Sequence, residues 1–519
     1  MDIFENVLLM LVAACLLLQL SRRLALPYPS MLALAGVALG AMPWVPHISL
    51  DPHLALALFI APALLDSAFD TAPRELRRNW LPLVSLVLVA VLLTTAAVAW
   101  AGWAFAGLPL AAAITLGAIV APPDAVAAAA VMQQFRIPRR TLSVINGESL
   151  LNDAVALLVF GVAVSAAGSA HLPITSSLPM LLVAVPGGAL VGIVFAKLNL
   201  HVGAPLFAGT RSAIIFQFVM TFGAWIVAER LHLSPIISVV AFGMTLGQYA
   251  PGRNAPRDRV HSYAVWGAVV FTLNVLAFFL MGLQARGIVD RLSGPALAHA
   301  LQFAGIVLAL VIAVRVGWVL FYGAVMRAAK HRLGFKPRRI AIPSKRIGLL
   351  VGWSGMRGLV TMATAFALPT DFPGRDLIVL SAFAVVLGTL VIQGFTIGPL
   401  IRALRIAPDA SLEEEISLAR TAMMDAALSA LEAENGTEAE AVRDEYRAAR
   451  VLASDTAEPQ AKTAHDRLRA TAIRAQRQAL DGLRASGRIE DDTYHRLEEE
   501  MDWAELNAIP AADVRLQSV

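Results

Sequence analysis

The sequence has little charge and almost no cysteine. Of its 519 residues, 15% are charged and one, Cys15, is a cysteine, whereas 57% are hydrophobic and the mean hydropathy is +0.66. A lone cysteine excludes a disulfide framework and a metal site built on several thiolates. So little charge at this length excludes an ordinary soluble protein and is typical of a helical protein that crosses a membrane many times.

Acidic residues are scarce before residue 407 and abundant after it. Residues 1–406 hold 29 Lys and Arg against 14 Asp and Glu, whereas residues 407–519 hold 13 against 24. The basic excess lies in short loops between apolar segments, so it indicates membrane topology and not nucleic-acid binding. We therefore expect a transmembrane domain over residues 1–406. The Ala-, Glu-, Arg- and Leu-rich residues 407–519 predict a cytoplasmic tail of three or four amphipathic helices, with a role in assembly favoured over ligand sensing.

Apolar segments recur through the whole first domain, and the sequence predicts an all-α polytopic membrane protein of about 13 transmembrane helices. The start of the chain has no basic region and no small-residue cleavage site, so we expect the first helix to be retained. Lys and Arg fall in alternate loops, which places the N-terminus outside and the C-terminus in the cytoplasm. The segments cover residues 4–20, 25–42, 52–69, 80–107, 109–132, 144–167, 178–200, 211–230, 234–250, 262–285, 300–328, 346–369 and 376–401.

Two of these segments are interrupted halfway. The fifth contains Pro122 and Pro123, which remove backbone donors, and the twelfth contains three glycines and an arginine within residues 352–358. A broken helix at membrane depth is tolerated only where it is buried in protein or lines a cavity. The interruptions stand at corresponding places if segments 1–6 and 8–13 are inverted repeats. Such a pair points to the binding site of a secondary transporter.

Five charged residues lie deep in the apolar segments, where a charge is normally functional or paired. They are the carboxylates Asp124, Glu148 and Asp153 and the cations Arg315 and Arg357. Arg315 lies too far from either helix end to reach water and needs a partner. Arg357 can pair either with a carboxylate or with helix-end carbonyls at the break. With three carboxylates facing two arginines, one carboxylate is left to exchange a proton for a cation.

Residues 147–153, which read GESLLND, open the sixth apolar segment. On a helix Glu148 stacks with Asn152 and Ser149 with Asp153, which gives two neighbouring polar rows on one face. For Glu148 a structural ion pair and a role in transport are equally well supported. For Asp153 transport or proton relay is favoured.

These motifs resemble those of the monovalent cation:proton antiporter family, in the electroneutral sodium/proton exchanger branch that includes bacterial NhaP-type and animal NHE-type proteins. The resemblance covers residues 5–405 and rests on residues 122–126 (PPDAV), 147–153 and 352–358 (GWSGMRG). It implies a homodimeric, multi-pass protein of a bacterial cell (inner) membrane, with roles in sodium transport and pH homeostasis. It also implies that the protein is not an enzyme and needs no cofactor.

The resemblance assigns roles to individual residues. Asp153 binds the cation (Na⁺) or a proton, and Glu148 forms a structural ion pair with Arg315. Many members carry Thr-Asp where this chain has Pro123 and Asp124, so Ser149 and backbone carbonyls would replace the threonine oxygen. Arg357 supplies the charge of the second broken helix. The expected ion-binding residues are Asp153, Asn152, Ser149, Asp124 and Pro123.

Together these features predict a secondary active antiporter that exchanges a monovalent cation, most readily Na⁺, for H⁺ by alternating access. Asn152 cannot ionise, so a single titrating group implies one cation for one proton. A K⁺/H⁺ antiporter of the same fold is the first alternative. A cation channel would use the same charges without needing two broken helices, and a sensor would use the acidic tail as its output. Transport by residues 1–406 alone would argue against the sensor. The expected partners are Na⁺ (or K⁺ or Li⁺), H⁺ and membrane lipid, and no nucleic acid.

Overall fold

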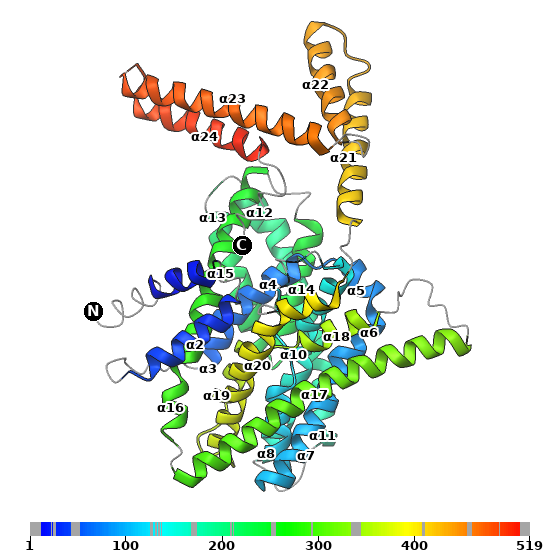
Figure 1. Cartoon of the computed structure of the whole chain (residues 1–519), viewed down its shortest axis with the longest axis vertical. Coiled ribbons are helices and arrows are strands. Elements are labelled where there is room, and N and C mark those ends of the chain that lie inside the picture. Colours follow the sequence, from blue (N-terminus) through cyan, green and yellow to red (C-terminus); the bar gives the residue numbers. More distant parts are fainter. Residues whose placement is uncertain are drawn as a thin grey trace. The chain divides into compact units, whose positions relative to one another are not determined.

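The computed structural model describes residues 12–21, 23, 27–42, 52–124, 128–129, 132, 135, 137–167, 174–207, 210, 212–250, 256–291, 294–333, 344–406, 411–453, 459–486 and 488–508. All regular secondary structure in these ranges is helical (Figure 1), which confirms the predicted fold class. The chain forms two compact units, Met1–Pro408 and Asp409–Val519.

Each of the thirteen predicted apolar segments holds at least one helix in its described part. Residues 4–11 of the first segment lie outside the described residues, and its helix covers Val12–Ser21. The other helices of the first unit are α2 (Tyr28–Gly40), α3 (Pro52–Ala55), α4 (Ala61–Phe69), α5 (Pro73–Arg78), α6 (Trp80–Val84), α7 (Val91–Ala106), α8 (Leu110–Val120), α10 (Arg139–Ala167), α11 (Ile174–Leu198), α12 (Ala204–Phe207), α13 (Ser212–Arg230), α14 (Pro235–Tyr249), α15 (Pro256–Leu283), α16 (Ala285–Val289), α17 (Gly294–Leu333), α18 (Lys345–Trp353), α19 (Leu359–Phe366) and α20 (Arg375–Leu404).

Seven of the described helical stretches are long and apolar enough to cross a membrane by themselves, and further apolar helices are shorter. Short π-helical stretches join some neighbours into one rod, as Ser85–Ala90 does between α6 and α7. The number of membrane crossings, thirteen, stays a prediction. The seven stretches are Trp80–Ala106, Arg139–Ala167, Val183–Phe207, Ser212–Arg230, Arg259–Val289, Gly294–Ala329 and Arg375–Leu404.

Aromatic side chains project outward at both ends of the rod that α6 and α7 form. Trp80 is 54% exposed where the rod begins, and Trp100 and Trp103 are 58% and 60% exposed near its other end. Tryptophan at both ends of an apolar span is typical of the two membrane–water interfaces. The rod therefore has the length and the terminal aromatic residues expected of a helix that crosses the bilayer.

Several pairs of helices cross with their backbones in contact, which only small residues allow, and two of these crossings bear on the predicted repeat. A Cβ atom at Gly36 of α2 would lie 2.9 Å from the Cα of Gly282 of α15. At the other crossing, a Cβ at Gly243 of α14 would lie 2.9 Å from the carbonyl oxygen of Leu65 of α4. The first crossing joins segments 2 and 10 and the second joins segments 9 and 3. Exchanging segments 1–6 with segments 8–13 converts one crossing into the other, as inverted repeats require.

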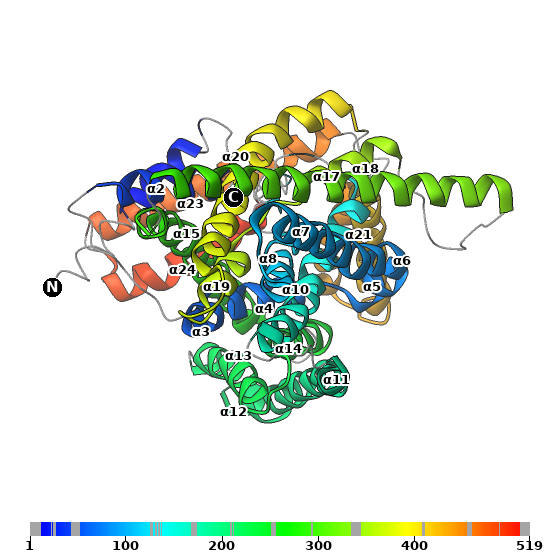
Figure 2. The same ribbon diagram turned by 90° about the horizontal axis from the view of Figure 1, so that it is seen from below.

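A bundle of helices surrounds both predicted interruptions. Helix α8 packs against α7 and α10, while α17 packs against α7, α18 and α20. Figures 1 and 2 show the long α17 running beside α7 and α18. Helix α8 ends at Val120, and the twelfth segment is divided between α18 and α19. Residues 125–126 of the first interruption lie outside the described residues.

The second unit consists of four described helices, α21 (Ser411–Ala430), α22 (Thr437–Ala453), α23 (Pro459–Ala485) and α24 (Asp491–Ala508). Helix α21 packs against α22, and α23 packs against α24. Arg477 of α23 donates hydrogen bonds to Asp502 (2.6 Å) and Glu505 (2.8 Å) of α24, and the hydroxyl of Tyr494 donates to Asp481 (2.9 Å). The predicted three or four tail helices are therefore four, in two antiparallel pairs.

Replacing Gly282 by leucine should destabilise the first unit, because the new side chain would collide with the backbone of α2. Overpacking of this kind costs about 1–3 kcal/mol. We expect a lower midpoint of thermal unfolding in detergent for Gly282→Leu. Gly267→Leu in the same helix is the matched control, since no atom lies within 4 Å of a Cβ at that position. Equal midpoints for the two variants would contradict the close crossing.

Candidate functional site

The two interrupted helices meet at their non-helical residues. The backbone N–H of Asp124, after the end of α8, donates a hydrogen bond to the carbonyl oxygen of Met356 (2.7 Å), which lies between α18 and α19. Met356 is fully buried. A break at membrane depth frees backbone groups that find no water there, so they require partners inside the protein. Each break supplies a partner to the other.

Arg357 binds the carbonyl groups that the first break leaves without helical partners. Its Nε donates to Val120 O (3.0 Å) and its Nη2 donates to Ala121 O (3.1 Å), both at the end of α8. Its Nη1 donates to Gly355 O. The side chain is wholly buried, and none of the described carboxylates bonds to it. A cation at a helix C-terminus also interacts favourably with the helix dipole. Of the two pairings left open for Arg357, the structure has the pairing with helix-end carbonyls.

Thr389 of α20 holds the second break from the other side. Its Oγ1 accepts a hydrogen bond from the backbone N–H of Arg357 (3.0 Å) and donates one to Val386 O (3.1 Å). The sequence did not single out Thr389, because a lone threonine in an apolar helix usually bonds only within its own helix. A contact to residue 357 leaves no local signal in the sequence.

Glu148 of α10 and Arg315 of α17 form a bidentate ion pair inside the first unit. Arg315 Nη1 lies 2.5 Å from Glu148 Oε1, and Nη2 lies 2.9 Å from Oε2. Nη2 also donates to Val351 O (3.3 Å), at the end of α18. The two side chains are 1% and 3% exposed. A fork-shaped contact of this kind neutralises both charges and fixes their relative orientation.

Gly355 lies between the two buried arginines. A Cβ at this position would overlap the Nε and Cδ atoms of Arg315, while the carbonyl oxygen of Gly355 accepts from Arg357. The close approach therefore requires glycine. The contact with Gly355 also buries Arg315 Nε, which has no hydrogen-bond acceptor among the described residues.

The polar rows of α10 face the first break. Asn152 is fully buried, and its Nδ2 donates to Pro123 O (2.8 Å), whereas its Oδ1 accepts no hydrogen bond from the described residues. Asp153 is 6% exposed, and no described residue bonds to its carboxylate. Ser149, one helical turn before Asp153, is half-buried. The structure thus brings Asn152 and Pro123 into contact and leaves the Asp153 carboxylate uncommitted.

Asp124 lies beside the start of α19. Its Oδ2 atom lies so close to Gly358 that a Cβ there would overlap it, and Gly358 precedes the first residue of α19. A carboxylate at a helix N-terminus interacts favourably with the unpaired N–H groups there. Asp124 is therefore placed to stabilise the start of α19, as Arg357 stabilises the end of α8.

An uncommitted carboxylate away from water is unfavourable as a bare anion, and it becomes stable when it binds a proton or a cation. The oxygen atoms of Asp153 and Asn152 are hard ligands, which suit alkali cations and not soft metals. The site can therefore hold either H⁺ or a small monovalent cation. If the carboxylate bound H⁺ and a monovalent cation at the same time, the pair would carry an excess positive charge.

Comparisons with known proteins agree with this chemistry. The family described as "Sodium/hydrogen exchanger, transmembrane" matches residues 7–403. An uncharacterized Na⁺/H⁺ exchanger of Mycobacterium tuberculosis is 31% identical over 516 residues, covering 93% of this chain and 92% of the relative. A protein of Bacillus pumilus named as a sodium, potassium, lithium and rubidium/H⁺ antiporter is 29% identical, covering 71% of this chain and 56% of the relative.

The fold also resembles a solved structure. The sodium proton antiporter of Methanocaldococcus jannaschii superimposes with a TM-score of 0.61 at 16% identity, covering 78% of this chain and 99% of that chain. At this identity the likeness concerns the arrangement of helices.

Removing either partner of the Glu148–Arg315 pair should destabilise the protein, because the remaining charge is buried without compensation. The expected loss is about 3–5 kcal/mol for Glu148→Gln or Arg315→Gln alone. The double variant should be less destabilised than either single variant. Thermal or denaturant unfolding of all four proteins in detergent measures the coupling. Strictly additive losses would show that the contact does not contribute to stability.

Proposed function

The chain belongs to the sodium/hydrogen exchanger family and is a cation/proton antiporter, and we propose that it exchanges Na⁺ for H⁺, one for one, at Asp153. The observation that carries this proposal is the charge balance of the buried site. Glu148 is neutralised by Arg315, and Arg357 is bonded to carbonyl groups. Asp153 remains as a buried carboxylate to which no described residue bonds.

The proposed cation ligands come from three parts of the site. Asp153 supplies the charge, and Asn152 Oδ1 is a buried oxygen without a described donor. Ser149 lies on the same row of α10 as Asp153 and supplies a hydroxyl oxygen. Pro123 acts indirectly, because its carbonyl orients Asn152. Asp124 stabilises the start of α19, and its charge raises the affinity of the site for cations.

Alternating access follows if the bundle that contains both breaks moves against the remaining helices and exposes Asp153 to each side in turn. The bonds between the two breaks would keep the site intact during this movement. We further propose that residues 1–406 carry out exchange in a bacterial inner membrane, with the N-terminus outside and residues 407–519 in the cytoplasm. Two copies would form a homodimer.

K⁺ exchange is the second candidate. The relative from Bacillus pumilus carries potassium in its name beside sodium. In this chain Pro123 offers no side-chain oxygen to the cation, so fewer ligands constrain the size of the ion. Selectivity among Na⁺, K⁺ and Li⁺ is measured by adding each in turn to proteoliposomes with an imposed pH gradient.

Asp153→Asn should abolish exchange while the protein still folds, because it removes the one group that alternates between proton and cation. The measurement is dissipation of a pH gradient in proteoliposomes on addition of Na⁺. Asp376→Asn is the control, since Asp376 lies at the surface, 3.6 Å from Arg291. Asp124→Asn should keep part of the activity. Exchange at the wild-type rate by a folded Asp153→Asn protein would refute the proposal.

The membrane potential should not shift the equilibrium of exchange, because one proton against one monovalent cation moves no net charge. A potential of 100 mV contributes about 2.3 kcal/mol for each net charge that crosses the membrane. The measurement is the cation gradient at which flux reverses, in liposomes held at zero or negative potential by an ion that the protein does not carry. A reversal point that moves with potential would mean that a second group titrates, with Asp124 the first suspect.

A further inference from the structure

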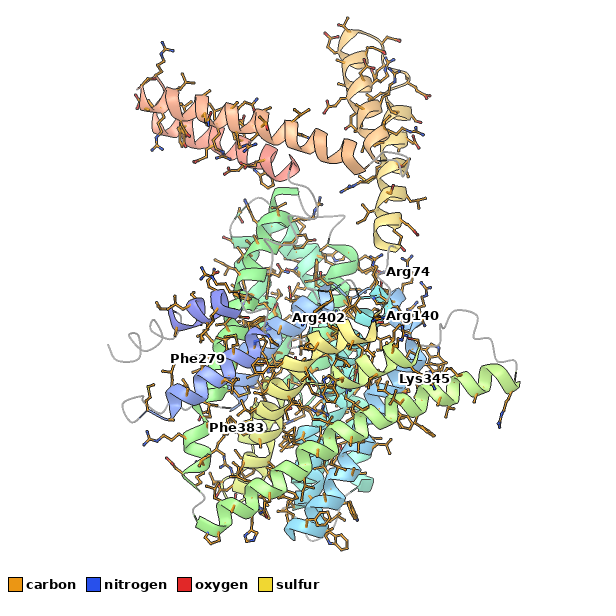
Figure 3. The ribbon with its side chains drawn as sticks, in the orientation of Figure 1. Arg74, Arg140, Phe279, Lys345, Phe383 and Arg402 are labelled. Carbon is orange, nitrogen blue, oxygen red and sulfur yellow. The ribbon has the colours of Figure 1, made fainter. Side chains whose placement is uncertain are left out.

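The junction of α5, α6 and α10 gathers arginines at one end of the first unit. The last turn of α5 carries Arg77 and Arg78, and the first turn of α10 carries Arg139 and Arg140. The two helices are in contact, and Leu76 of α5 packs against Gly147 of α10. Figure 3 shows Arg74 of α5 and Arg140 at the same end of the unit. Positive charge in the first turn of a helix opposes the helix dipole, so this arrangement needs compensation.

Among the described residues, no carboxylate compensates the charge of Arg140. Its Nη2 atom is buried and donates to no acceptor of the described residues. Its ionisable neighbours are Arg78, which repels it, and Tyr322 of α17. No described carboxylate forms an ion pair with either Arg78 or Arg140, although Glu75 lies in the first turn of α5. A preference for basic residues on one side of the membrane explains exposed arginines. It does not explain a buried guanidinium N–H without an acceptor, which is costly.

An apolar strip leads directly away from these arginines. Trp80, Val84, Leu88 and Leu92 are 54%, 46%, 44% and 43% exposed, and they follow one another at intervals of four along the rod of α6 and α7. Trp80 places the start of the rod at headgroup level. Arg78, two residues earlier, is exposed at the same level. The positive charge of the arginines therefore lies at the depth of lipid phosphates. The exposed apolar side chains of α6 and α7 lie at the depth of the acyl chains.

We propose that the junction of α5, α6 and α10 binds the phosphate of an anionic phospholipid through Arg78 and Arg140, with the lipid's acyl chains lying along the exposed face of α6 and α7. The two guanidinium groups offer several N–H donors, which match phosphate oxygens well. The phosphate supplies negative charge between two like charges and hydrogen-bond acceptors for the guanidinium groups. Anionic lipid is attracted to basic residues at this depth in any case.

Arg140 also lies at the start of α10, the helix that carries Glu148, Asn152 and Asp153. A bound lipid therefore holds one end of the helix on which the candidate ion site is built. Its effect on stability is separable from ion exchange, since neither arginine touches that site.

The test uses the purified full-length protein in detergent and measures the midpoint of thermal unfolding as phosphatidylglycerol is added. Phosphatidylcholine and inorganic phosphate are the parallel ligands. We expect phosphatidylglycerol to raise the midpoint of the wild-type protein, because a ligand that binds the folded state stabilises it. Arg140→Gln and Arg78→Gln should each weaken the apparent affinity for this lipid about tenfold or more. Arg140→Lys should recover part of the affinity.

Arg402→Gln is the matched control, because Arg402 is an exposed arginine in the last turn of α20 and should leave lipid binding unchanged. Without lipid, Arg140→Gln should unfold no earlier than the wild-type protein, whereas a purely structural role for Arg140 predicts earlier unfolding. Equal lipid affinity for Arg140→Gln, Arg78→Gln and the wild type would overturn the proposal, as would equal effects of inorganic phosphate or phosphatidylcholine. Ion exchange is not measured, so the outcome is independent of the antiport proposal.

Discussion

The contact of Arg357 with the carbonyl groups at the end of α8 is the interaction on which the site depends. Two broken helices inside a membrane domain leave backbone groups that water cannot reach. Val120 and Ala121 find their donor in Arg357, and Asp124 finds its acceptor in Met356. Without these bonds the unwound residues would either rewind into helix or separate. The open backbone that lines the site exists because each break completes the other.

The buried charged residues fall into two groups, those paired within the protein and Asp153. The ion pair of Glu148 and Arg315 ties α10 to α17 and, through Val351, to the end of α18. This pair and Arg357 are committed to protein partners. The carboxylate of Asp153 lies on the same helix as Glu148, and no described residue bonds to it. The fixed charges thus set the geometry of the site, and Asp153 is the carboxylate that we propose responds to ions in solution.

The sequence predicts the helices and the interruptions well, because these depend on local properties. A run of apolar residues long enough for a bilayer indicates a helix whatever it packs against, and two prolines or three glycines indicate a break by themselves. The sequence also predicts that Glu148, Asp153 and Arg315 are functional or paired, because a charge in an apolar segment has a high free-energy cost.

The residues to which a buried side chain bonds are harder to predict, because they come from distant parts of the chain. Both a carboxylate and a helix end are suitable partners for Arg357, and composition does not choose between them. The bond to Thr389 and the need for glycine at position 355 depend on distances between helices, to which no residue pattern corresponds. The crossings of α2 with α15 and of α4 with α14 reveal the repeat even though the two halves share no visible sequence similarity.

The position of Arg357 in the chain has a consequence for biosynthesis. Its acceptor on α8, Val120, lies 237 residues earlier and therefore leaves the ribosome long before it. Until the eleventh segment enters the membrane, Glu148 lacks Arg315, and until the twelfth segment follows, the end of α8 lacks its donor. Both halves of the site must therefore wait in an unfinished state, sheltered by the translocation machinery or close to water. The site closes as one of the last steps of insertion, so truncation of the chain before Arg357 would leave the carbonyl groups at the end of α8 without their donor.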